Sequence, residues 1–238
     1  MRLFFMDKTM TPTSFVATID VTLRQYADAQ IAFDMRAYLL NQFEFLGIRA
    51  PVRRQAVKAI ATNTVWTSPQ EVIDIAQRLW EKPEREFRYT AIDILKRHAK
   101  WFDVSHLPEL LHLLQRESWW ETVDGLTSVI GLIIRRQVQA GILDAQRICD
   151  DWIEHSDFWV RRCAMLHQLG WRLDTDTNRL LRYSEQLASE EEFFIRKAIG
   201  WALRDYARWN PTAVQNFIEQ KQDIFSGLTV REATKHLK

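Results

Sequence analysis

The chain has 238 residues, 47% of them hydrophobic, so it can bury a sizeable core without disulfides or metal staples. Its 32 Lys and Arg residues nearly cancel its 31 Asp and Glu residues, which excludes the strongly basic character of many nucleic-acid-binding domains. Any anionic partner must therefore be held by a local patch of charge.

The opening segment, MRLFFMDKTM, has too short an apolar part for a secretory signal, and no stretch approaches the roughly 18 apolar residues that span a bilayer. We therefore expect a cytoplasmic protein. Cys149 and Cys163 lie within helical patterns and lack metal-ligand spacing, so we expect reduced packing residues. The ten tryptophans are unusual, and several lie beside charged residues, which indicates that some do more than fill a core.

Helical periodicity runs through nearly the whole chain, which has only seven glycines and six prolines. The sequence therefore predicts an all-α fold. In chain order, the predicted helices span 11–27, 31–45, 51–63, 68–80, 84–99, 105–116, 118–136, 144–155, 157–170, 176–188, 190–208, 210–221 and 228–237. We expect Ser68, Asp144 and Asn210 to be N-caps, since each offers a side-chain acceptor where a helix begins.

Helices of this length with short connections favour a stack of helix pairs over one compact bundle. The pairs recur roughly every 35 to 40 residues, as HEAT-like repeats do. We predict an α-solenoid of stacked antiparallel helix pairs that forms one domain, 1–238, and presents a concave binding face.

The predicted helix 190–208 has two opposite stripes. One is apolar and faces the core, with Ile195, Ile199, Ala202 and Tyr206. The other combines one large aromatic with three cations: Lys197, Trp201, Arg204 and Arg208. Two interpretations are open: the tryptophan packs against the next repeat while the cations are solvated, or it is an aromatic plate between phosphate-binding cations.

The predicted helix 118–136 gives its two tryptophans different positions. Trp119 shares the apolar stripe, whereas Trp120 and Asp124 lie on a separate flank. That flank continues with small residues, Thr127, Ser128 and Gly131, which would let a bulky partner approach closely. Alternatively, Asp124 only pairs with an arginine and Trp120 only packs between repeats.

Arg162 falls in the apolar sector of its predicted helix, whereas Arg161 points elsewhere. An arginine in that sector needs an anionic partner, and we expect either Asp124 or a bound phosphate. Near the start of the stack, Tyr38 is a possible aromatic contact, and Arg53 with Arg54 is a possible phosphate clamp.

Most familiar enzyme classes are disfavoured. The six histidines show neither metal spacing nor a companion cysteine nucleophile, and there is no Gly-rich phosphate loop or GxSxG elbow. We expect neither a metal nor a cofactor.

Five segments carry a resemblance to a known family: MRAYLLNQFEFLGIRAPVRR, LWEKPEREFRYTAIDIL, SWWETVD, WVRRCAMLHQL and EEFFIRKAIGWALRDYARWNP. With them, the chain resembles the AlkD-like DNA alkylation repair enzymes over nearly all of its length after about residue 15. This resemblance implies a HEAT-like-repeat DNA glycosylase that releases 3- and 7-alkylated purines from double-stranded DNA.

The resemblance also implies roles for individual residues. The functional aromatic and acidic positions of the SWW segment fall on Trp120 and Asp124, and the other positions fall on Arg162, Trp201 and Tyr38. Glu121 stands where an Asp is common in the family, on the far side of the helical wheel. We expect a catalytic group of Asp124, Trp120, Trp201 and Arg162, with DNA contacts from Tyr38, Arg53, Arg54, Lys197, Arg204 and Arg208. We expect the protein to be a monomer. The alternative function is a non-enzymatic HEAT-like scaffold that binds DNA or a protein partner.

Overall fold

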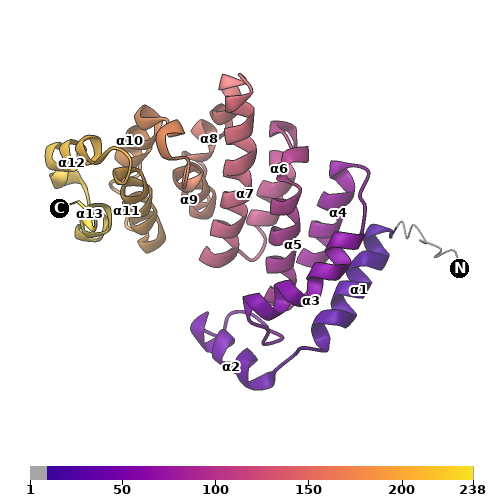
Figure 1. The fold of residues 1–238 in the computed structure, drawn as a ribbon. Coiled ribbons are helices and arrows are strands. Elements are labelled where there is room, and N and C mark those ends of the chain that lie inside the picture. Colours follow the sequence, from indigo (N-terminus) through magenta and orange to yellow (C-terminus); the bar gives the residue numbers. More distant parts are fainter. Residues whose placement is uncertain (1–9, 238) are drawn as a thin grey trace, which may run out of the picture. The chain divides into compact units, whose positions relative to one another are not determined.

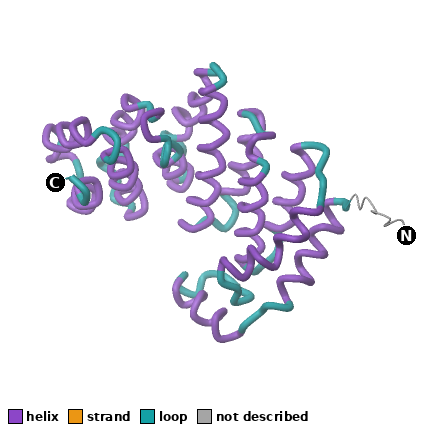
Figure 2. Tube along the Cα trace, in the orientation of Figure 1, coloured by secondary structure: helices purple, strands orange, loops and turns teal. Residues whose placement is uncertain are grey.

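The computed structural model describes residues 10–237, which form thirteen α-helices and five short 3-10 helices (Figures 1 and 2). Within these residues there is no strand, only an isolated bridge between Glu44 and Glu84. The all-α prediction is confirmed.

The α-helices match the predicted ones one for one. They are α1 (Pro12–Arg24), α2 (Ala29–Tyr38), α3 (Ala50–Asn63), α4 (Pro69–Trp80), α5 (Arg85–Arg97), α6 (Leu107–Leu114), α7 (Trp120–Gln139), α8 (Arg147–Trp152), α9 (Phe158–Leu166), α10 (Thr177–Gln186), α11 (Phe193–Ala207), α12 (Pro211–Gln220) and α13 (Gly227–Thr234).

The helices group into two compact units, which divide between Phe102 and Asp103. In the first unit, α1 packs against α3 and α4, and α5 packs against both α3 and α4. In the second unit, α7, α9, α11 and α13 pack one after another, and each contacts the helix that precedes it in the chain (Figure 1). The second unit is therefore a stack of helix pairs, as the sequence predicts. That both units form one domain stays a prediction.

Two of the three expected N-caps are confirmed. Ser68 accepts a hydrogen bond from the N–H of Glu71 and forms a capping box with it, and Asn210 caps α12. The expectation for Asp144 is wrong. It lies inside the 3-10 helix Leu143–Gln146, so the α-helix begins later, at Arg147, without a side-chain cap.

Helix α2 differs most from its prediction, because it ends at Tyr38 and not near residue 45. Leu40 and Asn41 both adopt the left-handed conformation, with φ of 58° and 56°, which ends the helix. The carboxylate of the fully buried Glu86 then holds the following loop, since it accepts hydrogen bonds from three consecutive backbone N–H groups, those of Leu46, Gly47 and Ile48.

Both cysteines are buried free thiols, as expected for packing residues. Burial raises the pKa of the Cys163 thiol to about 12 and that of Cys149 well above its usual range, so neither thiol is reactive at neutral pH.

Residues 1–9, most of the opening segment that was considered as a secretory signal, lie outside the described residues. Among the helices that the structure describes, none is both long enough and apolar enough to cross a membrane.

Candidate functional site

The centre of the site is an ion pair between α9 and α7. Nε and Nη2 of Arg162 each donate a hydrogen bond of 2.8 Å to a different carboxylate oxygen of Asp124. Nη1 of Arg162 donates a third bond, of 2.6 Å, to the backbone carbonyl of Phe194 in α11. The prediction that Arg162 needs an anionic partner is confirmed, and of the two candidate partners the structure contains Asp124. Arg161 points elsewhere, as expected, and pairs with Glu190.

The two members of this pair differ in their exposure to solvent. The Arg162 side chain is 1% exposed, whereas the Asp124 side chain is 24% exposed. Bidentate pairing uses one lone pair of each carboxylate oxygen and leaves the other lone pairs available. A buried cation therefore fixes the orientation of a carboxylate whose outer edge reaches solvent.

The electrostatics of Asp124 reflect this position. Burial raises the pKa of the Asp124 carboxyl above its usual range, while the hydrogen bonds and the charge of Arg162 act in the opposite direction. The pair thus contains an anion that is incompletely hydrated and has one fixed counter-charge.

Trp201 adds an aromatic face beside the pair. The guanidinium of Arg162 lies 5.4 Å from the centre of the Trp201 ring. Lys197 and Arg204, one turn before and after Trp201 on α11, approach the same ring to 5.3 and 5.9 Å. The predicted stripe of one aromatic among cations is confirmed for these three residues, and such cation–π contacts contribute about 0.5–1 kcal/mol each at exposed sites.

The cations of α11 differ in how their charges are compensated. Arg204 forms an ion pair with Glu232 of α13, so part of its charge is already neutralised. Arg208 is exposed at the C-cap of α11, and Lys197 is half-buried over the rings of Trp201 and Phe193.

The two neighbouring tryptophans have separate positions, as predicted. Trp119 precedes α7 in extended conformation and packs edge-on against Phe194, with Trp159 beside it. Trp120 is the first residue of α7, half-buried, one turn before Asp124. Three of the predicted catalytic residues are therefore linked by direct contacts through Arg162, and Trp120 lies on the same helix as Asp124.

The small residues that follow Asp124 do not form an open approach for a partner. Thr127 is 3% exposed, and a Cβ on Gly131 would lie 2.2 Å from the backbone carbonyl oxygen of His167. Gly131 therefore allows α7 and α9 to pack closely, which corrects the expectation that this flank is a surface; only Ser128 is exposed. On α7, the candidate site is therefore confined to the N-terminal turns, which carry Trp120 and Asp124.

Three predicted DNA contacts lie in the first unit. Tyr38 is the last residue of α2, and 72% of it is exposed. Arg54 is also exposed, but Arg53 is only 3% exposed and donates to Asp93 and to the carbonyl of Glu86. The expectation that both arginines form a surface clamp needs correction, because Arg53 faces inward from α3 toward α5.

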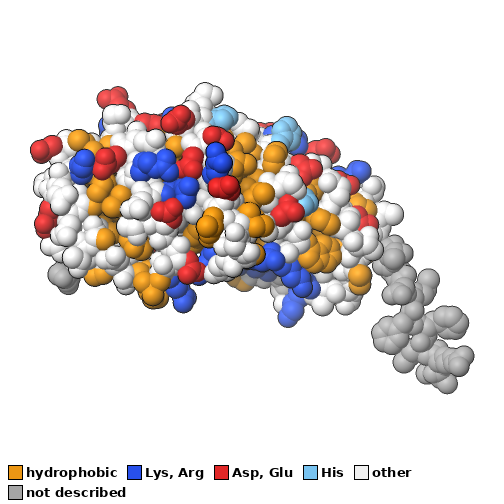
Figure 3. Space-filling model, turned by 90° about the horizontal axis from the view of Figure 1, so that it is seen from above, with side chains coloured by type: hydrophobic (Ala, Val, Ile, Leu, Met, Phe, Trp, Pro, Cys, Tyr) orange, Lys and Arg blue, Asp and Glu red, His pale blue; other side chains and the backbone are white. Residues whose placement is uncertain are grey.

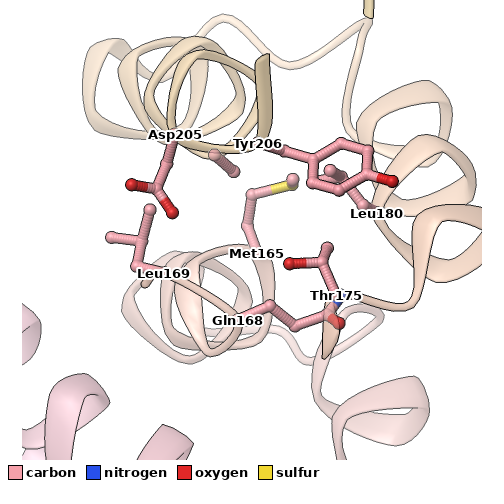
Figure 4. Close-up of a pocket in the computed structure, with 8 residues that line it drawn as sticks. Met165, Gln168, Leu169, Thr175, Leu180, Asp205 and Tyr206 are labelled. Atoms are coloured by element: carbon pink, nitrogen blue, oxygen red, sulfur yellow. The ribbon is translucent and has the colours of Figure 1, made fainter. Parts of the chain in front are cut away.

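Other features of the described residues do not suggest a second chemical centre. A small cavity in the second unit, bordered by Met165, Gln168, Asp205 and Tyr206, has a volume of about 10 Å³ (Figure 4), which is the space of one water molecule. No group of three or more His, Cys, Asp or Glu side chains is arranged to hold a metal ion in the region that the structure describes. On the face drawn in Figure 3, basic and acidic side chains are interleaved.

Two contributors to the site were not predicted from the sequence. The carbonyl of Phe194 accepts from Arg162, and Glu232 compensates Arg204. A backbone carbonyl carries no signal in the residue type. The sequence offers only a weak signal for Glu232 as the partner of Arg204: it is an acidic residue in a later helix than the one that carries the cationic stripe.

The fold and the site together define a helical-repeat protein. Its consecutive repeats place a carboxylate that is oriented by a buried arginine beside the ring of a tryptophan. The chain belongs to the family of DNA alkylation repair enzymes, whose family model matches residues 19–237.

Comparison with solved structures agrees with this assignment. A predicted DNA alkylation repair enzyme from Enterococcus faecalis is 29% identical, with a TM-score of 0.81 over 89% of this chain and 96% of that chain. AlkD2 from Streptococcus mutans is 20% identical, with a TM-score of 0.59 over 77% and 90% of the two chains. The smu.31 protein of Streptococcus mutans UA159 is 18% identical, with a TM-score of 0.59 over 91% and 100%. The last two show the fold alone. A comparison with curated proteins gives no match.

Proposed function

We propose that this protein is a DNA glycosylase that hydrolyses the N-glycosidic bond of cationic 3- or 7-alkylated purines in duplex DNA. The observation that carries the proposal is the Asp124 carboxylate, which Arg162 orients by two hydrogen bonds and which remains 24% exposed. We further propose that the protein acts on DNA as a monomer, and that it does so in the cytoplasm.

The chemistry of the substrate explains why one carboxylate is sufficient. Alkylation at N3 or N7 gives the purine a positive charge, so the base departs with the electron pair of the C1′–N bond and becomes neutral. The sugar acquires oxocarbenium-like charge at C1′ as this bond breaks. A nearby carboxylate stabilises that charge, and no strong general acid is required to assist the leaving group.

Asp124 supplies this negative charge, either directly at C1′ or through a water that it orients. In the second case, the water oxygen forms the new bond to C1′, and Asp124 accepts the proton that the water loses. Arg162 holds the carboxylate in place and is therefore a positioning residue. Trp120 and Trp201 offer electron-rich faces to the sugar or the cationic base, each worth on the order of 1 kcal/mol when water is excluded.

Most of the remaining predicted contacts bind the DNA backbone. In the second unit, Lys197, Arg204 and Arg208 are the proposed phosphate contacts. In the first unit, the exposed Arg54 is a proposed phosphate contact and the exposed Tyr38 a proposed aromatic contact, whereas the buried Arg53 pairs with Asp93. If these cations replace counterions on DNA, the affinity falls steeply with salt concentration.

The competing function is a scaffold that binds DNA or a protein without chemistry. One observation favours it: a bidentate pair with a buried arginine is also what a purely structural ion pair looks like. The two functions differ in what they require of the Asp124 charge.

The deciding experiment measures the release of free base from methylated duplex DNA. For Asp124→Asn we expect continued DNA binding and base release slower by about 10²–10³-fold, the usual effect of removing a preorganised electrostatic group. Asp150→Asn is the matched control, because Asp150 also accepts from arginines, Arg179 and Arg182, within the same unit. We expect this control to retain base release per folded molecule.

Two results would contradict the proposal. Wild-type protein that releases no methylated base, or Asp124→Asn that releases it at the wild-type rate, would favour the scaffold. Release of uracil, a neutral base, at a rate comparable to 7-methylguanine would show that the charge of the lesion does not drive the reaction.

A further inference from the structure

Helix α13 approaches α11 closely because a glycine faces it. A Cβ on Gly200 of α11 would lie 2.5 Å from the Cβ of Glu232 and 3.0 Å from the carbonyl oxygen of Thr229. The hydroxyl of Thr229, which is 1% exposed, donates a hydrogen bond of 3.1 Å to the backbone carbonyl of Arg196. The two helices lie side by side (Figure 1). Their packing therefore fixes where Glu232 lies relative to α11.

This packing places Glu232 beside the cationic stripe of α11. Its carboxylate accepts a hydrogen bond from Nη1 of Arg204 and forms an ion pair with it. The Arg204 side chain is 21% exposed and that of Glu232 is 20% exposed, so most of the pair is shielded from solvent. Salt screens such a pair less than it screens a fully exposed one. Glu232 thus restricts where the guanidinium of Arg204 can lie.

The arginine that Glu232 holds in turn contacts the ring of Trp201. Its guanidinium lies 5.9 Å from the ring centre, and the guanidinium of Arg162 lies 5.4 Å from the same centre. Each arginine is bound by a carboxylate on another helix. Asp124 of α7 binds Arg162, and Glu232 of α13 binds Arg204. The ring of Trp201 therefore contacts two arginines whose positions are set by neighbouring helices.

The third cation at this ring, Lys197, is held differently. It approaches the ring centre to 5.3 Å but forms no ion pair with any residue that the structure describes. An ammonium on a flexible stem can move freely, whereas a planar guanidinium bound by a carboxylate cannot turn without losing that bond. Arg204 is therefore the cation of α11 that can fix the ring of Trp201.

We propose that Glu232 is a positioning residue of the site: through Arg204, it holds the ring of Trp201 beside Arg162 and Asp124. Glu232 does not touch the substrate in this role. Its negative charge keeps Arg204 against the ring, and a reaction that depends on oriented groups is sensitive to the position of each of them. The importance of the ring for base release rests on the proposed function, whereas the position of the ring does not.

The test compares Glu232→Gln with a matched control, Glu190→Gln. Gln keeps the size of the side chain and removes the charge, so Arg204 loses its anchor. Glu190 pairs with Arg161 in the same unit, and these two side chains are 21% and 19% exposed, close to the values of the Glu232 pair. Among the described residues, no cation–π contact joins Arg161 to Trp201. We expect both variants to fold, with similar and small losses of stability.

The position of the ring is measured by fluorine NMR of protein labelled with fluorotryptophan. The resonance of Trp201 is identified as the one that is missing from Trp201→Phe. We expect Glu232→Gln to shift this resonance, because the guanidinium beside the ring moves, and Glu190→Gln to leave it unchanged. In an Arg204→Met background, Glu232→Gln should lose this effect, since its proposed action passes through Arg204.

Base release from methylated duplex DNA is measured in single turnover, together with DNA affinity. Glu232→Gln should release the base about two- to fivefold more slowly, which corresponds to the loss of one exposed cation–π contact. Its DNA affinity should not fall, because Arg204 keeps its positive charge. A purely structural role of Glu232 would instead lower the folded fraction, so that binding and release would fall together.

Three results would overturn the inference. They are a wild-type Trp201 resonance in Glu232→Gln, a shift of equal size in the Arg204→Met background, and a shifted resonance with a wild-type rate of base release. The glycosylase proposal fails separately, if wild-type protein releases no alkylated base. If Glu232→Gln then still shifts the ring only when Arg204 is present, the position of Trp201 depends on Glu232 all the same.

Discussion

The change Asp124→Asn should destabilise the second unit as well as affect chemistry. Asn keeps the shape of the side chain and one acceptor oxygen but removes the charge. Because Arg162 is 1% exposed, its guanidinium cannot turn to solvent after its counter-charge is lost. It would keep one amide oxygen at position 124, the carbonyl of Phe194 and the faces of Phe194 and Trp201, but no counter-charge.

The size of the effect follows from the burial of the pair. Removal of one member of a buried ion pair costs about 3–5 kcal/mol. Asp124 is 24% exposed, and Asn retains one acceptor, so we expect a lower value, about 2–3 kcal/mol. In a protein of this size, that lowers the melting temperature by roughly 4–12 °C. Thermal and urea unfolding, followed by circular dichroism, measure the change.

The double variant Asp124→Asn/Arg162→Met separates stability from chemistry. It removes both charges, so the uncompensated cation disappears, and we expect the double variant to be more stable than Asp124→Asn alone. If Asp124 acts on the substrate, base release stays low although stability returns. Asp124→Asn with wild-type stability, or strictly additive effects of the two substitutions, would refute the view that Arg162 is a buried cation dependent on Asp124.

Three further predictions concern the packing around the sites. Gly131→Ala should destabilise the second unit by about 1–3 kcal/mol, since its Cβ would clash with the backbone of α9; Ser128→Ala on the exposed side of α7 is the control in urea unfolding. Burial lowers the pKa of His167 from 6.5 to about 4, so only the unfolded state gains its proton between these values. The free energy of unfolding should therefore fall by up to about 3 kcal/mol as the pH drops from 6.5 to 4. His167→Gln should lack this pH dependence when unfolding is measured over the same pH range. Glu86→Gln should expose the amide protons of residues 46–48 to faster hydrogen exchange, because an amide group replaces one of the carboxylate oxygens that hold them. Unchanged exchange at these amides would show that the loop does not depend on Glu86.

The sequence was a good guide where periodicity determines the structure. All thirteen predicted helices are present, and the wheel of α11 correctly opposed its apolar stripe to Lys197, Trp201 and Arg204. The prediction that Arg162 needs an anionic partner also followed from its position on the helical wheel, because a charged side chain in the apolar sector of a helix requires a partner. These inferences depend only on the residue spacing within one helix.

The errors arose where a contact between helices determines the structure. Gly131 was interpreted as leaving room for a partner, but a helical wheel does not show that α9 already occupies that room. Arg53 and Arg54 are adjacent and equally basic, yet the turn of α3 buries the first and exposes the second. The loop that follows α2 is held by Glu86, which lies 40 residues after Leu46 in the chain.

Arg162 links three consecutive repeats of the second unit at one point. From α9, its guanidinium holds the carboxylate of Asp124 in α7, bonds the first turn of α11 through the carbonyl of Phe194, and lies beside the ring of Trp201. A shift of any of these helices by one turn, about 5.4 Å, would break at least one of these contacts. The same buried cation therefore fixes the register of the helices and the position of the proposed catalytic carboxylate. It follows that the site's geometry is determined by the packing of the repeats, and that substitutions at Arg162 should impair stability and base release together, whereas substitutions at Trp120 should impair base release alone.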